Sequence, residues 1–575
     1  MAAEAGADKV TAIEVFSPMA KMAAEIFRDS KFKNTIELIS SRSTDLSQSS
    51  LTERGNLIVA EVFDTELIGE GALRTFKEAH ETLVKRGSRV IPSSARIWIL
   101  PVESRFLEKF NKTPSMVLKS PCDNCPGSAA VFDVQLSQLS SGNFTALGTP
   151  FIAFEFNFED PDSIQYDEWK TCDFIVSKVA EERAVMNAVL MWWDLDMDGS
   201  GKNILSMAPT WFEDNSPWRD HWLQAVYFLP EKRSVVKDES LKICCAHDEY
   251  SLWFSTQSSD SVNFMDKPLC KCQMHVTCAR SSIFRMNDLE ENSSFMKFLN
   301  QTCLKKSVVC INEGSLLGLY AAQFASDVTI VDSNPHFRMV LEKYKRFNKI
   351  TNVVIVESVD EIQEAPSVAL SEPFYFSSLS TWNNLRFWFD VERIRTRFPD
   401  ANFEVFPRCG VLYAMPVEFE HLWKIASKVG VVEGHDLSKF DELCQKARCA
   451  TDPVVEPQPL WEYASICTGK PVEVARFDIT KKLPFENIRF EKIIQATRLG
   501  TNAITFWMDW IFTDELIINT GILKHCTAGD CPQWHPGHRQ SVHFIEQMPG
   551  KGVAEITVSS NFQVEDGDIT FQFVL

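Results

Sequence analysis

Four carboxylates crowd the short stretch EVFDTELIGEG, residues 61–71, directly after the apolar run NLIVA. The acids are Glu61, Asp64, Glu66 and Glu70, and the run before them has the pattern of a buried strand. Like charges repel, so acids placed together at the end of a strand call for a cationic partner. A guanidinium suits two carboxylates, because its planar fork offers parallel donors to their oxygens. We infer that two of these acids hold such a group.

Alternating strands and helices are expected to position these acids. In TAIEVFSPMAKMAAEIF, β-branched residues lead into one acid and then a proline before helical periodicity begins, and VTIVDSNPHFRMVLEKY repeats this order. Three pairs of residues recur in unchanged order, 311 to 318 residues apart: Glu14 and Asp332, Glu61 and Glu372, and His221 and His535. A nearly constant offset predicts a tandem duplication of one module of about 310 residues.

The predicted fold class is α/β plus β, present in two tandem modules. Each copy begins with the strand–helix alternation of a Rossmann-like doubly wound sheet. Each copy then turns to strand-rich sequence such as VLMWWDLDMDGSGKN, which predicts an antiparallel β-barrel, with a sandwich as the alternative, and a hairpin turn.

Composition excludes several classes of protein. The 575 residues carry a formal net charge of -20, which argues against a nucleic-acid binder and suits a basic partner. No apolar run approaches the roughly 18–20 residues of a membrane span, and the first residues lack a secretory signal. Sixteen cysteines scattered through a large chain are typical of reduced cytosolic thiols.

Several stretches carry a resemblance to a known family: AGADKVTAIEVFSPMA, EVFDTELIGEGAL, WRDHWLQAVYFLP, HDEYSLWFS, CKCQMH and QPLWEY. In collinear order over almost the whole length, the chain resembles the protein arginine methyltransferase 7 family, a tandem of two methyltransferase modules. The resemblance implies methyl transfer from S-adenosylmethionine to an arginine nitrogen, with monomethylarginine formed at Arg-x-Arg sites of basic proteins such as histones and RNA-binding proteins. It also implies catalysis in the N-terminal module only, a monomer whose halves act as a pseudo-dimer, no nucleic-acid or membrane partner, and a cytoplasmic and nuclear location.

The resemblance assigns roles to the acidic loop. Glu61 and Glu70 match the family's double-glutamate hairpin and are the expected catalytic pair. Asp64 is expected to help select a second substrate arginine, although a turn-capping aspartate is the alternative. Glu66 is interpreted as a helix-start acid. His221 and Trp222 match the Thr-His-Trp loop that lines the arginine pocket, with Asp220 in place of the threonine.

Cofactor residues follow from the same resemblance. Glu14 is the expected ligand of the ribose hydroxyls, because an acid at a strand end can accept both. Ser43 and Thr44 fall where the family contacts the adenine edge, and a polar turn is the alternative. No Gly-x-Gly loop precedes this region, so we expect weak cofactor binding by this chain and interpret it as N-terminally truncated. The alternative function is a catalytically impaired scaffold.

The second module is expected to be degenerate. Its counterpart of the cofactor loop, VVCINEGSLLGLYAA, holds only Gly314 and Gly318, and the position nine residues after Glu372 is Thr381. Without the glycines and the second acid, this copy is predicted to bind no S-adenosylmethionine and to act as a scaffold.

Soft ligands cluster in LCKCQMHVTC. Cys270, Cys272 and His275 have a spacing that suits structural Zn²⁺, and the resemblance implies zinc at the module junction. His247 is the predicted fourth ligand, with Cys278 and Cys245 as competitors. Free cysteines in a buried linker are the alternative. The motif CDNC at 122–125 is interpreted as part of a surface insertion.

The predicted organisation has five parts. They are an incomplete Rossmann-like methyltransferase domain at 1–95, a β-barrel with an arm-like insertion at 96–255, a zinc-binding linker at 256–300, a degenerate Rossmann-like domain at 301–415 and a second β-barrel at 416–575.

Overall fold

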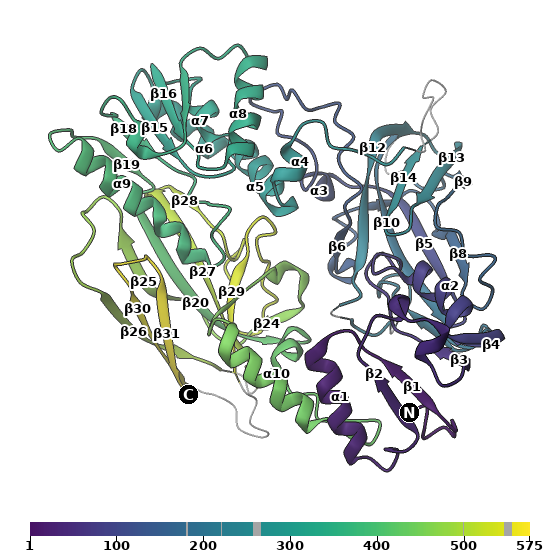
Figure 1. Ribbon diagram of the computed structural model, residues 1–575. Coiled ribbons are helices and arrows are strands. Elements are labelled where there is room, and N and C mark those ends of the chain that lie inside the picture. The colour runs from purple at the N-terminus through teal and green to yellow at the C-terminus, as the bar shows by residue number, and fades with distance from the viewer. Residues whose placement is uncertain (180–181, 215, 220, 257–265, 498–499, 546–554) are drawn as a thin grey trace. The chain divides into compact units, whose positions relative to one another are not determined.

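The computed structural model describes residues 1–179, 182–214, 216–219, 221–256, 266–497, 500–545 and 555–575 (Figure 1). Within them the chain divides into two compact units. Unit 1 comprises Met1–Glu103, Ala129–Lys267 and Ser427–Asp452, and unit 2 comprises Ser104–Ser128, Pro268–Ala426 and Pro453–Leu575. Each unit therefore contains one segment from the other half of the sequence. Asp220, the predicted replacement for a threonine, lies outside the described residues.

The α/β part of unit 1 contains two small parallel sheets. Strand β1 (Val10–Ile13) pairs with β2 (Ile36–Ile39), and β3 (Gly55–Val59) pairs with β4 (Val84–Ile91). Helix α1 (Ser17–Asp29) follows β1 as the sequence predicts, with Pro18 in its first turn, and α2 (Ala72–Thr82) precedes β4. No described strand joins the two sheets.

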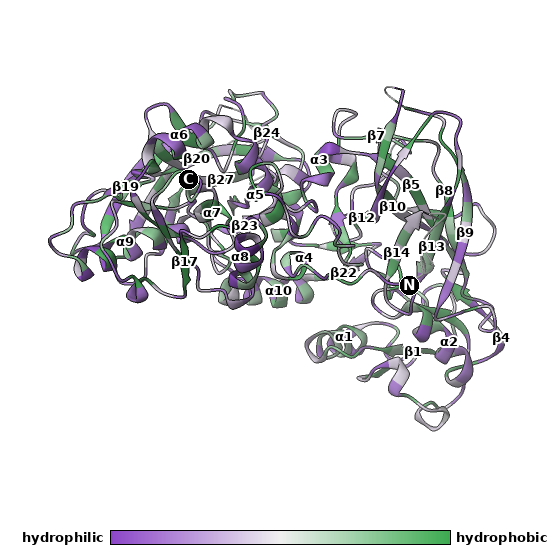
Figure 2. Ribbon diagram, turned by 90° about the horizontal axis from the view of Figure 1, so that it is seen from above, coloured by the Kyte–Doolittle hydropathy of each residue, from purple (hydrophilic) through white to green (hydrophobic). Residues whose placement is uncertain are grey.

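The β part of unit 1 is built on a long apolar strand. Strand β10 (Ala184–Asp196) lies in the centre of a seven-stranded sheet and is largely hydrophobic (Figure 2). It buries Trp192 and Trp193. The order of that sheet is β6-β12-β10-β5-β7, with β8 on β5 and β11 on β10. The other members are β5 (Ser94–Glu103), β6 (Phe132–Val134), β7 (Thr145–Ala146), β8 (Phe151–Asn157), β11 (Ile204–Ser206) and β12 (Gln224–Val235). A three-stranded sheet, β14-β13-β9, contains β9 (Glu168–Ile175), β13 (Ser240–His247) and β14 (Leu252–Thr256).

Unit 2 contains a complete doubly wound sheet. Its parallel strands have the order β17-β16-β15-β18-β19. They are β15 (Ser307–Ile311), β16 (Asp327–Val331), β17 (Val353–Val356), β18 (Val368–Leu370) and β19 (Glu404–Phe406). The helices are α5 (Arg280–Glu291), α6 (Ser293–Cys303), α7 (Leu317–Ala321), α8 (Pro335–Phe347) and α9 (Arg386–Arg397). Helix α8 begins where predicted, because the Asn334 side chain accepts hydrogen bonds from the backbone N–H groups of His336 and Phe337.

The β part of unit 2 has the same strand order as that of unit 1 when strands are paired in chain order. The seven-stranded sheet runs β23-β29-β27-β20-β24, with β25 on β20 and β28 on β27, and a second sheet runs β26-β30-β31. The members are β20 (Cys409–Phe419), β23 (Glu456–Gln458), β24 (Ser465–Cys467), β25 (Val472–Asp478), β26 (Ile488–Gln495), β27 (Ala503–Thr513), β28 (Leu516–Ile518), β29 (Gln540–Phe544), β30 (Glu555–Phe562) and β31 (Ile569–Val574). Closure of either set into a barrel stays a prediction.

The two exchanged segments are held by specific contacts. In unit 1 the hairpin of β21 (Val431–Val432) and β22 (His435–Asp436) leads into α10 (Ser438–Thr451), which lies beside α1 (Figure 1). Lys439 and Asp29 form an ion pair of 2.5 Å. In unit 2 the segment 104–128, which opens with α3 (Arg105–Glu108), is tied to α5 and α8. The buried Glu290 carboxylate accepts the N–H groups of Ser115 and Val117 at 3.0 and 2.6 Å.

Two predicted domain boundaries fall inside strands. The divisions between residues 95 and 96 and between 415 and 416 cut β5 and β20, each of which runs as one continuous strand. The borders therefore belong before these strands, because a paired strand forms as one element. The rest of the five-part division stays a prediction. In the described residues no helix has the length and apolar character to cross a membrane.

Candidate active site

The acidic loop between β3 and α2 is anchored by buried apolar side chains. Phe63, Leu67 and Ile68 are at most 2% exposed, although they alternate with the four acids. Leu67 adopts the left-handed conformation with φ of 68°, which turns the chain sharply between Glu66 and Glu70. The backbone is therefore fixed by residues other than the outer two acids.

Asp64 caps this turn. Its Oδ1 accepts hydrogen bonds from the backbone N–H groups of Glu66 and Gly69 at 3.1 and 3.0 Å. A Cβ atom at position 69 would collide with the Asp64 carboxylate, so the turn requires glycine there. The structure thus shows the turn-capping contact, which was the alternative for Asp64. Its part in selecting a substrate arginine stays a prediction.

Two indoles hold the loop from the β part of unit 1. Trp193 Nε1 on β10 donates to the Asp64 carbonyl oxygen at 3.1 Å, and Trp222 Nε1 donates to the Phe63 carbonyl oxygen at 2.9 Å. The two rings meet edge to face with centroids 5.3 Å apart. His221 lies next to this pair, with its ring centroid 4.7 Å from that of Trp222. The structure thus brings His221 and Trp222 to the acidic loop.

Glu66 is a buried anchor, which corrects its interpretation as a helix-start acid. It is 7% exposed, and its Oε1 accepts hydrogen bonds from the Tyr227 hydroxyl at 2.5 Å and from the Leu252 N–H at 3.2 Å. Burial raises the pKa of Glu66 to about 7. The sequence signal was the apolar pair Leu67–Ile68 directly after this acid, which indicates burial.

Glu61 and Glu70 differ from the inner acids because both are exposed. Among the described residues none donates a hydrogen bond to either carboxylate or forms an ion pair with it. Partial burial raises the pKa of Glu70, and the negative charges of Asp64 and Glu61 raise it further, whereas His221 lowers it. Glu70 therefore lies close enough to Glu61 and to His221 for their charges to interact, yet neither acid forms an ion pair with a described residue.

The predicted cofactor residues lie at the carboxyl ends of β1 and β2. Glu14 follows β1, and its Oε1 accepts the Phe16 N–H at 2.6 Å. Ser43 and Thr44 form the 3-10 turn Ser43–Asp45 after β2, and this turn packs against α2. Because β1 and β2 are parallel, these side chains share one edge of the sheet, where nucleosides bind in such folds. Among the described contacts, no hydrogen bond joins Glu14 to Glu61 or Glu70.

Four soft ligands meet in unit 2. The ligand atoms of Cys125, Cys270, Cys272 and His275 all lie within 4.8 Å of one another. The Cys270 and Cys272 sulfurs are 3.6 Å apart, close to the edge of about 3.8 Å that tetrahedral zinc–sulfur bonds require. His275, in the short helix α4 (Met274–Thr277), has its Nε2 2.7 Å from the Asn111 carbonyl oxygen, which leaves Nδ1 toward the sulfurs. This donor set fits a zinc ion.

The fourth member of this group corrects the sequence prediction. His247 lies in β13 of unit 1, where its ring packs against Phe154 and Phe156 and its Nδ1 bonds the Asp248 carbonyl oxygen. Cys125 takes the place predicted for His247. The motif CDNC, interpreted as a surface insertion, therefore supplies a metal-ligating side chain. Its Cys-x-x-Cys spacing was the available signal.

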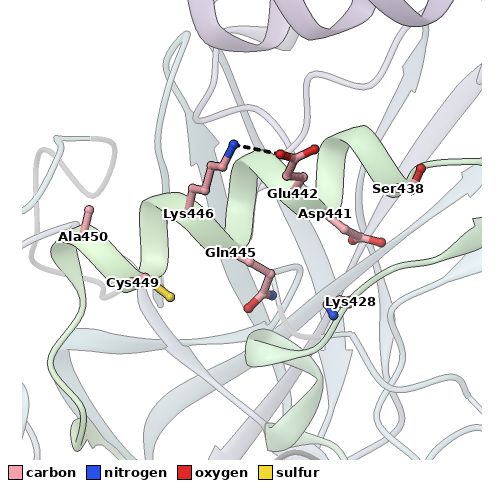
Figure 3. A pocket seen from close by; sticks show the side chains of 8 residues that line it. All are labelled: Lys428, Ser438, Asp441, Glu442, Gln445, Lys446, Cys449 and Ala450. Atoms are coloured by element: carbon pink, nitrogen blue, oxygen red, sulfur yellow. Dashed lines mark hydrogen bonds and ion pairs between the residues drawn. The ribbon is translucent and has the colours of Figure 1, made fainter.

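A separate hollow of about 620 Å³ runs along α10 (Figure 3). Lys428 and seven residues of α10 line it, and none of the predicted site residues does. Its acids already have partners, since Asp441 accepts the Val429 and Gly430 N–H groups and Glu442 pairs with Lys446 at 2.8 Å. The hollow carries no candidate site.

Comparison with known proteins defines the class and then the family. Residues 103–259 match the family described as the arginine methyltransferase oligomerization subdomain. A Caenorhabditis briggsae relative named protein arginine N-methyltransferase 7 is 42% identical over 580 residues, covering 100% of this chain and 86% of the relative. The Danio rerio relative of the same name is 33% identical, covering 100% of this chain and 88% of that protein. The chain therefore belongs to the protein arginine N-methyltransferase 7 family, and its enzyme class is protein arginine N-methyltransferase.

Solved structures give a weaker likeness. A Trypanosoma brucei PRMT1 enzyme–prozyme complex with AdoHcy matches with a TM-score of 0.35 and 14% identity, covering 48% of this chain and 88% of that chain. A crystal structure of PRMT6 matches with a TM-score of 0.34 and 13% identity, covering 51% and 99%. Similarities at this level support no inference about the site.

The raised pKa of Glu66 predicts a pH-dependent stability. Because the pKa rises from 4.5 to about 7 on folding, the protonated carboxyl stabilises the fold below about pH 4.5, and this contribution is lost as the pH rises through 7. Glu66→Gln keeps a neutral acceptor at every pH. Relative to wild type, the variant should gain up to about 3 kcal/mol of unfolding free energy between pH 5 and 8.

Urea unfolding followed by circular dichroism at several pH values measures this difference. The exposed Glu25 on α1 provides a matched control, and Glu25→Gln should show no such trend. A difference between Glu66→Gln and wild type that stays constant with pH would contradict the prediction.

Proposed function

We propose that unit 1 transfers a methyl group from S-adenosylmethionine to an arginine nitrogen, and that Glu61 and Glu70 grip the guanidinium. The observation that carries the proposal is that Glu61 and Glu70 are both exposed, that the charge of Glu61 raises the pKa of Glu70, and that no described residue donates a hydrogen bond to either carboxylate or forms an ion pair with it. Family membership supports the reaction class.

The residues of the loop have distinct tasks in this mechanism. An arginine keeps its proton at neutral pH because its pKa exceeds about 12. Glu61 and Glu70 bind the planar fork from two sides and orient one terminal nitrogen, which converts a loose encounter into an aligned one. A carboxylate oxygen of either acid accepts the proton that the nitrogen loses. His221 and Trp222 line the pocket beside them.

The cofactor supplies the methyl group, bound to a positively charged sulfur. Glu14 would accept the ribose hydroxyls, and Ser43 and Thr44 would contact the adenine edge. Their shared position at the carboxyl ends of two parallel strands supports this assignment.

The proposal also includes the class of substrate and the role of unit 2. The net charge of -20 supports a basic protein substrate such as a histone. Monomethylation at Arg-x-Arg sites is proposed from the family resemblance alone. A tandem pair of modules is supported by the equal strand order of the two seven-stranded sheets. Unit 2 then acts as a scaffold, in a monomer of the cytoplasm and nucleus, and catalysis is confined to unit 1.

A structural zinc ion is proposed for Cys125, Cys270, Cys272 and His275. All four belong to unit 2, and Cys125 comes from the segment 104–128. The ion would tie that segment to the residues that precede α5 and has no catalytic step.

A second candidate function is a scaffold without catalysis. It is favoured by one observation, the separation of the β1–β2 and β3–β4 sheets, because a cofactor usually binds at the middle of one continuous sheet. Calorimetric titration with S-adenosylmethionine distinguishes the two functions. Binding of S-adenosylmethionine that Glu14→Ala weakens at least tenfold would support the enzyme, and the missing Gly-x-Gly loop predicts that this binding is weak. Absence of binding heat would favour the scaffold.

Turnover should depend on both outer acids. In protein shown by calorimetry to bind the cofactor, Glu61→Gln and Glu70→Gln should each lower methyl transfer to an Arg-x-Arg peptide by about 10²–10⁴-fold, because each removes one grip on the guanidinium. Circular dichroism should be unchanged. Glu53→Gln, at an exposed acid outside the loop, is the control. Near-wild-type rates in both loop variants would exclude the proposed mechanism.

Zinc content should follow the geometry of unit 2. We expect about one zinc per chain by mass spectrometry of the metal, and Cys125→Ala or Cys272→Ala should remove it, because three ligands bind far more weakly than four. His247→Gln should leave zinc content unchanged. The proposed ligand set fails if His247→Gln loses the metal while Cys125→Ala keeps it.

A further inference from the structure

Glu372, the residue that pairs with Glu61 in the sequence repeat, is enclosed in unit 2. It follows β18 and is 4% exposed. Arg285 on α5 donates to its Oε1, and the Ser315 hydroxyl donates to its Oε2 at 2.6 Å. Both carboxylate oxygens therefore have partners from within the chain. This acid is not available to an external ligand while Arg285 is in place.

The Arg285 side chain is enclosed by polar and aromatic groups, as a bound ligand would be. It is 2% exposed, and its Nη2 donates to the Gly314 carbonyl oxygen at 2.9 Å. The guanidinium carbon lies 3.8 Å from the centroid of the Phe374 ring, which is close enough for a strong cation–π contact. A carboxylate, a carbonyl oxygen and an aromatic face thus surround one planar fork. A planar guanidinium can donate in its plane to both oxygens while its face stacks on the ring, and a tetrahedral ammonium lacks this geometry.

The same face of α5 also contacts His535, the residue that corresponds to His221 in the sequence repeat. Asp288 lies three residues after Arg285, on the same side of α5. Its Oδ2 is 3.4 Å from His535 Nε2. The loop that carries His535 packs directly on α5, since a Cβ atom at Gly537 would lie 3.2 Å from Arg285 Cα. One turn of α5 therefore presents a cation to the acid and an anion to the histidine.

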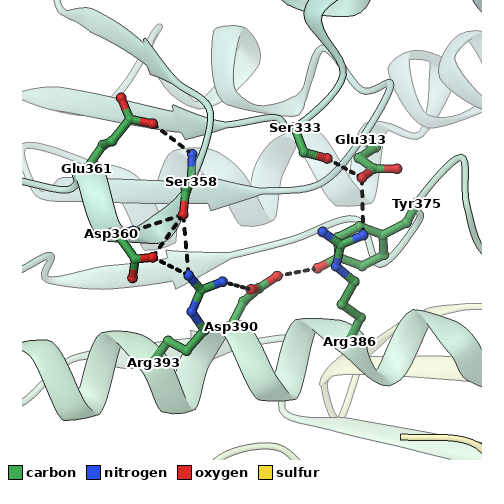
Figure 4. Close-up of polar contacts among 9 residues, drawn as sticks. All are labelled: Glu313, Ser333, Ser358, Asp360, Glu361, Tyr375, Arg386, Asp390 and Arg393. Carbon is green, nitrogen blue, oxygen red and sulfur yellow. Dashed lines mark hydrogen bonds and ion pairs between the residues drawn. The ribbon is translucent and has the colours of Figure 1, made fainter. Parts of the chain in front are cut away.

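A neighbouring acid of unit 2 is paired in the same way. Glu313, in the loop after β15, accepts from Arg386 Nη1 at 3.2 Å and from the Ser333 hydroxyl (Figure 4). Arg386 is 44% exposed and Glu313 is buried, so water reaches only the arginine side of this pair, whereas both partners of the Arg285–Glu372 pair are almost completely enclosed. Loss of Arg285 would leave a carboxylate buried without its cation.

We propose that unit 2 retains an arginine-binding site whose permanent ligand is its own Arg285, and that removing this side chain leaves a site for a free alkylguanidinium. The inference rests on the proposed tandem relation between Glu372 and Glu61. Its measurement is stability, whereas catalysis in unit 1 is measured by methyl transfer, so each proposal can fail without the other.

Chemical rescue of Arg285→Ala in the full chain tests the proposal. The variant should unfold about 5–15 °C below wild type, because Glu372 stays buried without its cation. Millimolar methylguanidinium should restore most of this loss. Methylammonium at the same concentration should restore little, because it lacks the planar fork. Wild type measured in both salts corrects for their general effects.

Two further variants sharpen the result. Arg386→Ala, which removes an arginine that is 44% exposed, should lose less stability than Arg285→Ala. The double variant Arg285→Ala with Glu372→Gln should lose the selective response, because the neutral amide no longer needs a cation. If Arg285→Ala does not fold alone, the yield of refolded soluble protein in each salt replaces the thermal midpoint. Equal effects of the two salts on Arg285→Ala, or selective rescue of the double variant, would overturn the proposal.

Discussion

The repulsion between Glu61 and Glu70 is the interaction on which the proposed site depends. The backbone that carries them is held by the Asp64 turn, by the indoles of Trp193 and Trp222, and by buried Glu66. None of these contacts brings a cation to the outer pair. The loop is therefore rigidly positioned while its charge stays uncompensated, and this combination suits the capture of a guanidinium from outside.

In unit 2, the negative charges of two buried acids are neutralised by arginines of the same unit. The β parts of the two units share one strand order, yet Glu372 is buried with Arg285 and Glu313 is paired with Arg386. A buried carboxylate requires a partner, because leaving it unpaired costs several kcal/mol. The parts that carry the acids differ, because Glu61 follows a strand of a two-stranded parallel sheet and Glu372 follows a strand of the five-stranded sheet. Glu61 is exposed without an ion pair to a described residue, whereas Glu372 is enclosed with its own arginine.

Local sequence patterns predicted much of the secondary structure, but they could not predict contacts between distant residues. The strand at β10 and helix α8 follow from apolar periodicity and a capping residue. Cys125 joins Cys270 across a large sequence separation, and no periodicity indicates which cysteine completes the group. His247 was a plausible ligand by type, but its ring is enclosed by Phe154 and Phe156. Type and spacing identify candidates, and packing decides among them.

Packing also decides what unit 2 needs in order to fold. The segment 104–128 precedes most of unit 1 in sequence, yet it satisfies polar groups inside unit 2. Glu290, 2% exposed, accepts two of its backbone N–H groups, and the buried Tyr344 hydroxyl donates to the Pro114 carbonyl oxygen at 2.8 Å. Without the segment, a carboxylate and a phenol would lose their partners in an apolar core, at a cost of about 1–3 kcal/mol each. Residues 268–575 alone therefore lack groups that their own core requires, so unit 2 is completed by a segment from the other half of the chain.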